Sequence, residues 1–192
     1  MEEEFNAAVW PEDPAPQEAA GCQRCGLHLQ GSRMIWGEGN PKAPAMVLLD
    51  NPGAREDKDG NPFICGTRQT LQKAAFQSGL NQDDLYVTFL LKCRPVRQYD
   101  KESARSTCFK HLENQLRLIK PRFIFCLGNT ATQWFFSDMD ADVKDLRAVW
   151  HTVKGIAACV SWHPLAVRRR PNLWGQFLAD WQMLASAVRT AT

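Results

Sequence analysis

The 192-residue sequence lacks any apolar run that approaches the about 18 residues needed for a membrane-spanning helix. Its first ten residues, MEEEFNAAVW, are acidic and contain no apolar segment of the kind that directs secretion. An excess of one charge is also missing, because 23 Lys and Arg against 21 Asp and Glu leave a formal net charge of +2. That balance does not by itself indicate a nucleic-acid-binding protein. We therefore expect a cytoplasmic protein without membrane contact.

A disulfide framework is not expected either, since seven Cys is an odd number and no export signal accompanies them. The 44% hydrophobic and 23% charged residues are ordinary for a globular protein, and the length suits one domain. Residues 1–20 are predicted to form a flexible arm, because neighbouring Glu side chains repel and Pro11, Pro14 and Pro16 interrupt regular hydrogen bonding. Residues 21–192 contain no further linker or repeat, so they are predicted to form a single domain.

Four short apolar runs predict buried strands, at residues 46–49, 86–91, 123–127 and 156–161. Helical patterns lie between and after them, at residues 70–79, 106–119 and 174–188. Alternation of strands with helices is typical of a parallel sheet that is covered on both faces. The sequence therefore predicts an α/β fold.

Polar sequences follow three of the predicted strands, where ligands bind in parallel α/β sheets. These sequences are Asp50-Asn51-Pro52-Gly53, Lys92-Cys93-Arg94-Pro95 and Trp162-His163-Pro164. Asp50 or Asn51 can hold a water molecule, and Gly53 permits a ligand to approach the backbone closely. A local turn that only satisfies its own backbone is the alternative for this segment. A His at a strand end, as His163 is, can donate to developing negative charge.

Four cysteines are candidates for one metal site, namely the C-x-x-C pair Cys22 and Cys25, with Cys93 and Cys108. Four thiolates suit either a 4Fe–4S cluster or a structural zinc ion. A single close pair with two distant cysteines favours the cluster, whereas two close pairs would favour zinc. The alternative is four unrelated small apolar residues, because free Cys is often buried.

A basic run follows His163-Pro164, with Arg168, Arg169 and Arg170 next to the apolar Leu165. Arginines bind phosphates, and an apolar neighbour can fill the space that a displaced base leaves in the DNA stack. The alternative is a solvated face with no partner.

Taken together and in this order, these motifs resemble the family 4 uracil-DNA glycosylases, which carry an iron–sulfur cluster. The similarity extends from residue 21 to about residue 181. Its landmarks in chain order are Cys22-x-x-Cys25, Pro52-Gly53, Glu56-Asp57, Gly60-x-Pro62-Phe63, Lys92-Cys93-Arg94-Pro95, Cys108, Ile119-Lys120-Pro121, Leu127-Gly128-x-x-Ala131 and His163-Pro164. The resemblance implies a three-layer α/β/α sandwich around a four-stranded parallel sheet, a 4Fe–4S cluster on the four cysteines, and DNA whose target base is flipped out of the duplex.

The resemblance also implies roles for single residues. Asp50 and Asn51 lie in the turn that positions the hydrolytic water and frames the base, and we expect the adjacent Gly53 to bind the substrate. Phe63 matches the aromatic residue that stacks on the flipped base. His163 matches the His that stabilises charge on the departing base. The segment 165–170, with Leu165, Arg168, Arg169 and Arg170, matches the loop that probes the minor groove.

The chain departs from the family pattern at three places near the predicted base site. The first is Leu49-Asp50-Asn51-Pro52-Gly53, where family members usually have Gly-Glu-Ala/Gly-Pro-Gly. Phe89 stands where the family has an Asn that reads the uracil edge, and Phe forms no such hydrogen bond. The segment Cys65-Gly66-Thr67-Arg68 replaces a Gly-rich turn. Between Lys92 and Cys108 there is no inserted basic loop ending in His, so we expect no covalent trapping of DNA.

The sequence therefore predicts a monomeric, monofunctional DNA glycosylase of base excision repair, acting on uracil or another deaminated base in DNA. One alternative is a non-catalytic iron–sulfur protein that binds DNA or senses damage and has lost uracil recognition. Another is a zinc-stabilised nucleic-acid-binding module of unrelated activity.

Overall fold

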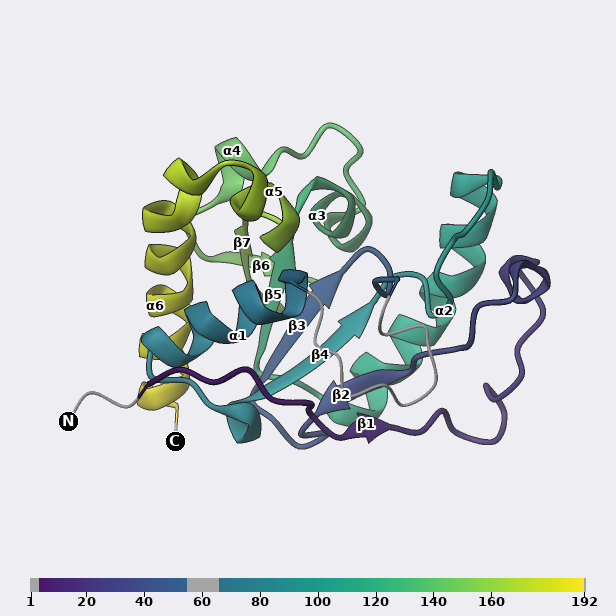
Figure 1. The fold of residues 1–192 in the computed structure, drawn as a ribbon, viewed down its shortest axis with the longest axis horizontal. Coiled ribbons are helices and arrows are strands. Elements are labelled where there is room, and N and C mark those ends of the chain that lie inside the picture. The colour runs from purple at the N-terminus through teal and green to yellow at the C-terminus, as the bar shows by residue number, and fades with distance from the viewer. Residues whose placement is uncertain (1–3, 55–65, 192) are drawn as a thin grey trace.

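The computed structural model describes residues 4–54 and 66–191, in which seven strands form one sheet (Figure 1). The strand order across the sheet is β1-β2-β4-β3-β5-β7-β6. The strands are β1 (Glu12–Asp13), β2 (Gly37–Gly39), β3 (Ala45–Leu49), β4 (Leu85–Phe89), β5 (Phe123–Leu127), β6 (His151–Val153) and β7 (Ile156–Ser161).

The four central strands, β4, β3, β5 and β7, are parallel, as the sequence predicts. They align in register, so that Val47 of β3 lies between Val87 of β4 and Phe125 of β5. This four-stranded parallel sheet is the centre of a larger one, because β1 and β2 extend one edge and β6 extends the other. Each added strand pairs antiparallel with its neighbour. These added strands are two or three residues long, which is too short to produce a recognisable alternating pattern.

Six α-helices occur in the described residues: α1 (Gly66–Gln77), α2 (Lys101–Ile119), α3 (Asn129–Phe136), α4 (Val143–Leu146), α5 (Pro164–Arg169) and α6 (Trp174–Thr190). The predicted helices at 70–79, 106–119 and 174–188 correspond to α1, α2 and α6. The start of α2 lies earlier than expected because the Asp100 side chain caps it, accepting a hydrogen bond from the Ser103 N–H at 3.1 Å. None of these helices is long and apolar enough to cross a membrane.

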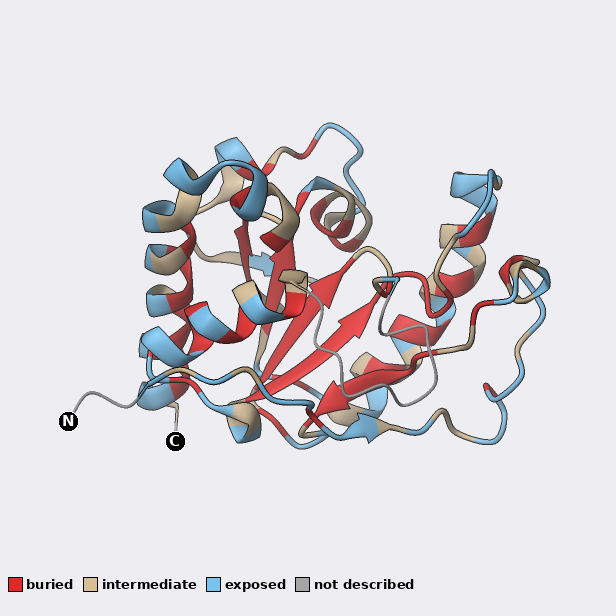
Figure 2. Cartoon of the chain, viewed as in Figure 1, coloured by how far each residue is buried: buried red, intermediate tan, exposed pale blue. Residues whose placement is uncertain are grey.

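Two apolar cores lie on the opposite faces of the sheet, as the alternation of side chains along each strand requires. Val47 and Phe125 pack on the side of α1 and α6, where Trp181 is buried. Met46 and Ile124 face the other way, toward residues of α2 and α3. Figure 2 shows the resulting pattern of largely buried central strands and helices whose outer faces are exposed. The fold is therefore the three-layer α/β/α sandwich that the sequence analysis predicts.

The segment before residue 21 makes specific contacts with this domain. The Trp10 side chain is 8% exposed and joins the core on the α1 side. The Gln72 side chain exchanges two hydrogen bonds with the backbone of Ala8, at 2.9 and 2.7 Å. The Tyr86 hydroxyl donates to the Asp13 carboxylate at 2.7 Å. The flexibility of residues 1–20 stays a prediction. The sequence did not predict the contacts of Trp10, Ala8 and Asp13 with the domain.

Candidate active site

A cavity of about 380 Å³ lies at the carboxyl ends of the four parallel strands. Its volume falls within the range of about 300–1,000 Å³ that is usual for small-molecule sites. Each parallel strand contributes residues from its end, and α1 closes one side. The lining residues are Leu49, Asp50, Asn51, Gly53, Thr67, Arg68, Leu71, Phe89, Leu127, Gly128, Asn129, Thr130, His163 and Leu165.

His163 enters the cavity from the end of β7, where it is also the N-cap of α5. Its Nδ1 accepts a hydrogen bond from the Leu165 backbone N–H at 3.1 Å. Because a backbone N–H can only donate, Nδ1 carries no proton, and the proton of the neutral ring is on Nε2. Burial lowers the pKa of His163, although the nearby Asp50 carboxylate opposes this effect, so the ring is neutral at pH 7.

Gly128, at the end of β5, makes room for this His. Its φ of +92° lies in the region that favours glycine, and a Cβ on it would lie 2.9 Å from the His163 Cβ. The close approach of β5 and β7 at this point therefore depends on the missing side chain.

Asp50 and Asn51 follow β3 and line the same cavity. The Asp50 carboxylate is held by the Arg105 guanidinium from α2, with Nε to Oδ1 at 3.3 Å and Nη2 to Oδ2 at 3.1 Å. The Asn51 amide donates from Nδ2 to the Pro52 carbonyl at 2.8 Å. Both side chains are therefore oriented by defined contacts. Arg105 was not predicted, since nothing in the local sequence of α2 distinguishes it from a surface arginine.

Arg68 and Phe89 form another part of the lining, from α1 and the end of β4. Both are buried, with 6% and 3% of their surfaces exposed. Arg68 forms an ion pair with Glu38 of β2. Burial lowers the pKa of Arg68 to about 9, which still leaves the guanidinium charged at neutral pH.

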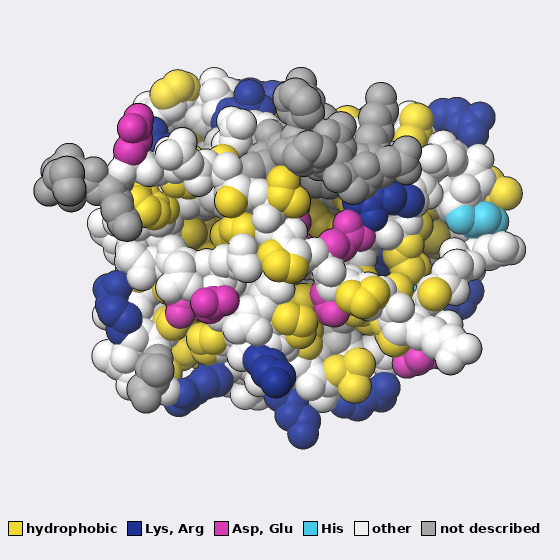
Figure 3. All heavy atoms as spheres, turned by 60° about the horizontal axis from the view of Figure 1, so that its bottom comes forward, with side chains coloured by type: hydrophobic (Ala, Val, Ile, Leu, Met, Phe, Trp, Pro, Cys, Tyr) yellow, Lys and Arg dark blue, Asp and Glu magenta, His cyan; other side chains and the backbone are white. Residues whose placement is uncertain are grey.

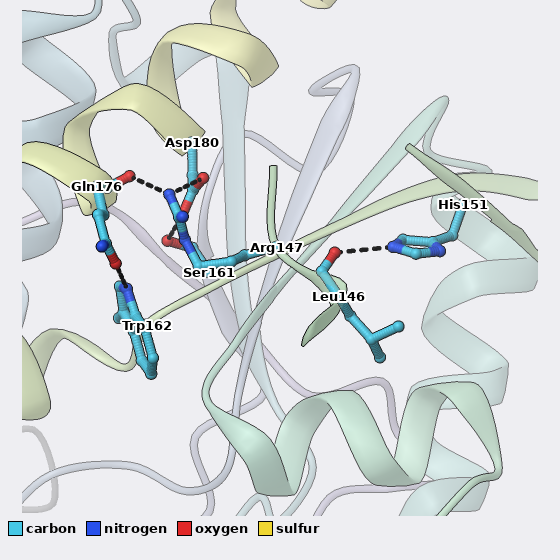
Figure 4. Close-up of polar contacts among 7 residues, drawn as sticks. All are labelled: Leu146, Arg147, His151, Ser161, Trp162, Gln176 and Asp180. Carbon is cyan, nitrogen blue, oxygen red and sulfur yellow. Dashed lines mark hydrogen bonds and ion pairs between the residues drawn. The ribbon is translucent and has the colours of Figure 1, made fainter. Parts of the chain in front are cut away.

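A polar network connects the end of β7 to α6, immediately before His163 (Figure 4). The Ser161 hydroxyl donates to Asp180 at 2.5 Å, and Arg147 binds the same carboxylate at 2.7 and 3.1 Å. Burial raises the pKa of Asp180, and the hydrogen bonds from Ser161 and Arg147 act in the opposite direction. The Trp162 indole N–H donates to the Gln176 side chain at 2.9 Å. These contacts position the backbone that carries His163.

The third polar strand end contributes differently from the other two. Lys92 is fully buried, and its ammonium group donates to Thr88 Oγ1 at 2.6 Å, to Gln115 Oε1 at 2.5 Å and to the Phe89 carbonyl at 2.8 Å. Burial lowers the pKa of Lys92 to about 7. Lys92 is not part of the cavity lining, so it supports the end of β4 from the α2 side of the sheet.

The cysteines predicted to bind a metal gather at one corner of the fold, which we call the cysteine corner (Cys22, Cys25, Cys93 and Cys108). Cys93 and Cys108 are buried in one apolar cluster, and Cys25 packs against it. Two sulfur atoms already accept hydrogen bonds: Cys108 Sγ from the Lys92 backbone N–H at 3.3 Å, and Cys22 Sγ from Arg24 Nε at 3.4 Å. In the described parts of the chain, no three His, Cys, Asp or Glu side chains converge as ligands of a single metal ion.

The basic run lies on the surface next to the cavity. Arg168, Arg169 and Arg170 are exposed, whereas Leu165 lies at the cavity. Elsewhere the surface charge is mixed, and the face in Figure 3 carries separate basic and acidic side chains among apolar ones. Phe63, the predicted stacking residue, lies outside the described residues.

A sequence model of the uracil DNA glycosylase superfamily matches residues 36–185, which is most of the chain. The chain belongs to this superfamily. The matched region contains every described cavity residue and two of the four corner cysteines, Cys93 and Cys108.

Several curated members of the superfamily are similar over most of their length. The chain is 31% identical over 180 residues to a type-4 uracil-DNA glycosylase of Archaeoglobus fulgidus, covering 90% of each chain. It is 32% identical over 172 residues to that of Pyrobaculum aerophilum, covering 84% of this chain and 87% of the relative. A third, from Sulfurisphaera tokodaii, is 32% identical over 166 residues, covering 82% and 76%.

Proposed function

We propose that this superfamily member is a monofunctional DNA glycosylase of base excision repair that hydrolyses the N-glycosidic bond of a flipped uracil or another deaminated base. The observation that carries the proposal is the meeting of His163 with Asp50 and Asn51 around one cavity at the strand ends. The similarity to type-4 uracil-DNA glycosylases supports it. We further propose that the protein acts as a monomer on DNA in the cytoplasm.

The reaction requires a hydrogen-bond donor at the base and a water molecule at the sugar. As the C–N bond breaks, the base takes the bonding electron pair and the sugar becomes oxocarbenium-like. His163 donates from Nε2 to the base that becomes negative, while its Nδ1 stays fixed by the Leu165 N–H. Asp50 and Asn51 position the water that attacks the sugar carbon. The carboxylate of Asp50 also stabilises the positive charge on the sugar. Gly53 lies along the base, and we assign Phe63 to stacking on it.

We propose that the cysteine corner holds a 4Fe–4S cluster, and that zinc is the less suitable occupant. A single zinc ion requires its ligands to converge on one tetrahedral centre. A four-iron cluster places its thiolates at separate corners, where N–H groups commonly donate to sulfur. The donors to Cys108 and Cys22 and the apolar surroundings of Cys93 fit that requirement. The cluster would join the segment of residues 22–25, the end of β4 and α2 into one unit.

The proposed activity is tested by strand cleavage with alkali after incubation with duplexes that contain uracil, hypoxanthine, xanthine or a mismatch. We expect alkali-dependent cleavage at one or more of the deaminated bases and none at undamaged DNA. Binding to all duplexes without cleavage of any would instead identify the non-catalytic alternative, a DNA-binding or damage-sensing protein.

The basic run gives a prediction about DNA binding. Changing Arg168, Arg169 and Arg170 together to Ala is expected to weaken binding to all sequences alike. The plot of log K against log salt concentration should become less steep, by about one unit of slope for each phosphate contact that is lost. Fluorescence anisotropy at several salt concentrations measures this slope. Arg33→Ala, which removes a partly exposed arginine paired with Glu12, is the matched control and should leave the slope unchanged. An unchanged slope in the triple variant would mean that these arginines only face solvent.

Phe89 gives a prediction about base choice. Phe89→Asn places an amide in the cavity where the wild type has an aromatic ring, and is expected to increase the rate of uracil excision. A pocket that hydrogen-bonds the polar edge of its substrate can reject an analogue without that edge by about 10⁴-fold. Phe89→Leu keeps the position apolar and should not produce the increase. If both variants excise uracil at the wild-type rate, Phe89 does not govern base choice.

A further inference from the structure

Arg68 lines the cavity but has no part in the proposed hydrolysis. It extends from α1, is 6% exposed, and belongs to the same lining as His163 and Phe89. Burying a charge costs free energy unless the charge is paired, and Glu38 supplies that pairing. Glu38 lies on β2 and is not part of the cavity lining. The ion pair therefore holds Arg68 from outside the cavity, while Arg68 itself reaches its surface.

The chemistry of this wall is unusual for a base pocket. A guanidinium carries five N–H donors and no acceptor, and its planar shape can serve more than one acceptor at once. The Phe89 side chain, which belongs to the same lining, adds neither donor nor acceptor. Arg68 therefore brings side-chain donors, and no side-chain acceptor, to the cavity lining.

Deaminated bases differ in how well they match such a wall. Uracil carries an N–H donor between its two carbonyl groups, so no edge presents two adjacent acceptors. A 6-oxopurine presents O6 and N7 side by side, and this pair is the preferred bidentate partner of an arginine. A cavity of about 380 Å³ accommodates a two-ring base as well as a one-ring base.

We propose that Arg68 is a specificity-determining residue that binds O6 and N7 of a deaminated purine, hypoxanthine or xanthine, in the cavity. This inference rests on the proposed glycosylase function and names its substrate class. Guanine shares the O6 and N7 edge. Its exclusion follows from flipping, because a base in an intact G·C pair costs more to extrude than a mispaired deaminated base.

The test compares single-turnover excision rates on otherwise identical duplexes that contain hypoxanthine, xanthine, uracil or guanine. The wild type is expected to excise hypoxanthine at least as fast as uracil and to leave guanine in G·C pairs intact. Arg68→Lys keeps the charge opposite Glu38 but loses the planar fork. It should lower the ratio of hypoxanthine to uracil excision by about ten- to a hundred-fold. Arg117→Lys, at an exposed arginine of α2 that donates to Asn114, should leave the ratio unchanged.

A second measurement needs no variant of the protein. Free hypoxanthine and 7-deazahypoxanthine differ only in N7, so wild-type inhibition by the deaza compound is expected to be about ten-fold weaker. Equal inhibition by the two compounds would overturn the assignment.

The outcomes separate this inference from the proposed function. If Arg68→Lys slows all bases equally and lowers the melting temperature, Arg68 only ties α1 to β2, and the inference is wrong while the glycosylase function stands. Efficient removal of guanine from G·C pairs would also overturn it. If the wild type excises none of the bases, the proposed function itself fails.

Discussion

Replacing His163 by Ala is expected to slow base excision by about 10²–10³-fold, the usual effect of removing one preorganised donor to developing charge. The reason is that the hydrogen bond from the Leu165 N–H to Nδ1 leaves the proton on Nε2, where it can reach the departing base. DNA binding should persist, because the exposed Arg168–Arg170 run is untouched. Single-turnover strand cleavage measures the rate, and fluorescence anisotropy measures the affinity for DNA.

The His163→Ala variant also loses the N-cap of α5, a change that typically costs about 1 kcal/mol of stability. His163→Asn separates the two effects, because Asn is a good N-cap residue but has no Nε2 donor. It should keep the wild-type melting temperature and still be slow. His151→Ala provides a matched control, since His151 lies on β6 and bonds the Leu146 carbonyl at 2.8 Å (Figure 4). Wild-type rates in His163→Asn would contradict the donor role.

Replacing Cys93 by Ser is expected to abolish the visible absorbance and most of the iron content of the purified protein. Its melting temperature should fall as well, because the free energy of metal binding contributes directly to folding. The Cys93 side chain is 6% exposed within an apolar cluster. Replacing its thiol by the Ser hydroxyl therefore also places a polar group in apolar surroundings. Iron analysis, visible absorbance and thermal unfolding measure the three effects.

Cys159→Ser is the matched control for this variant. Cys159 is also buried, but it lies within β7 and packs in the core on the α1 side, away from the cysteine corner. It should lower the melting temperature and keep the full iron content. Retention of all iron in Cys93→Ser would overturn the cluster assignment, and zinc in place of iron in the wild type would favour the zinc alternative.

The sequence by itself determines the central architecture of this protein. The runs at 123–127 and 156–161 coincide with β5 and β7, because continuous apolar runs are typical of strands buried on both faces. The long periodic patterns likewise correspond to α1, α2 and α6. Parallel strands bring their carboxyl ends to one edge, so the polar turns at Asp50 and His163 were expected to meet. The structure places both around one cavity, together with Gly53, Phe89 and Leu165. Their roles in catalysis and binding stay predictions.

Short elements were decided only by tertiary contacts. The strands β1, β2 and β6 form because an existing sheet edge offers them hydrogen-bonding partners, and their two or three residues carry no period of their own. Likewise Trp10 is buried because the α1 side of the core has room for it, although the surrounding prolines predicted a loose arm.

Arg68 and Arg105 show most clearly what the sequence could not determine about the site. Each lies within a helix, where an arginine is ordinarily a solvent-exposed residue. Whether its side chain reaches a cavity depends on how the helix is rotated and packed against the sheet. The tertiary structure brings Glu38 to Arg68 and Asp50 to Arg105. These carboxylates, distant in the sequence, supply the pairing that makes a partly or fully buried guanidinium tolerable. The polar residues at the strand ends could be predicted from the sequence. The positions of the charged residues that orient and border them depend on how the helices pack.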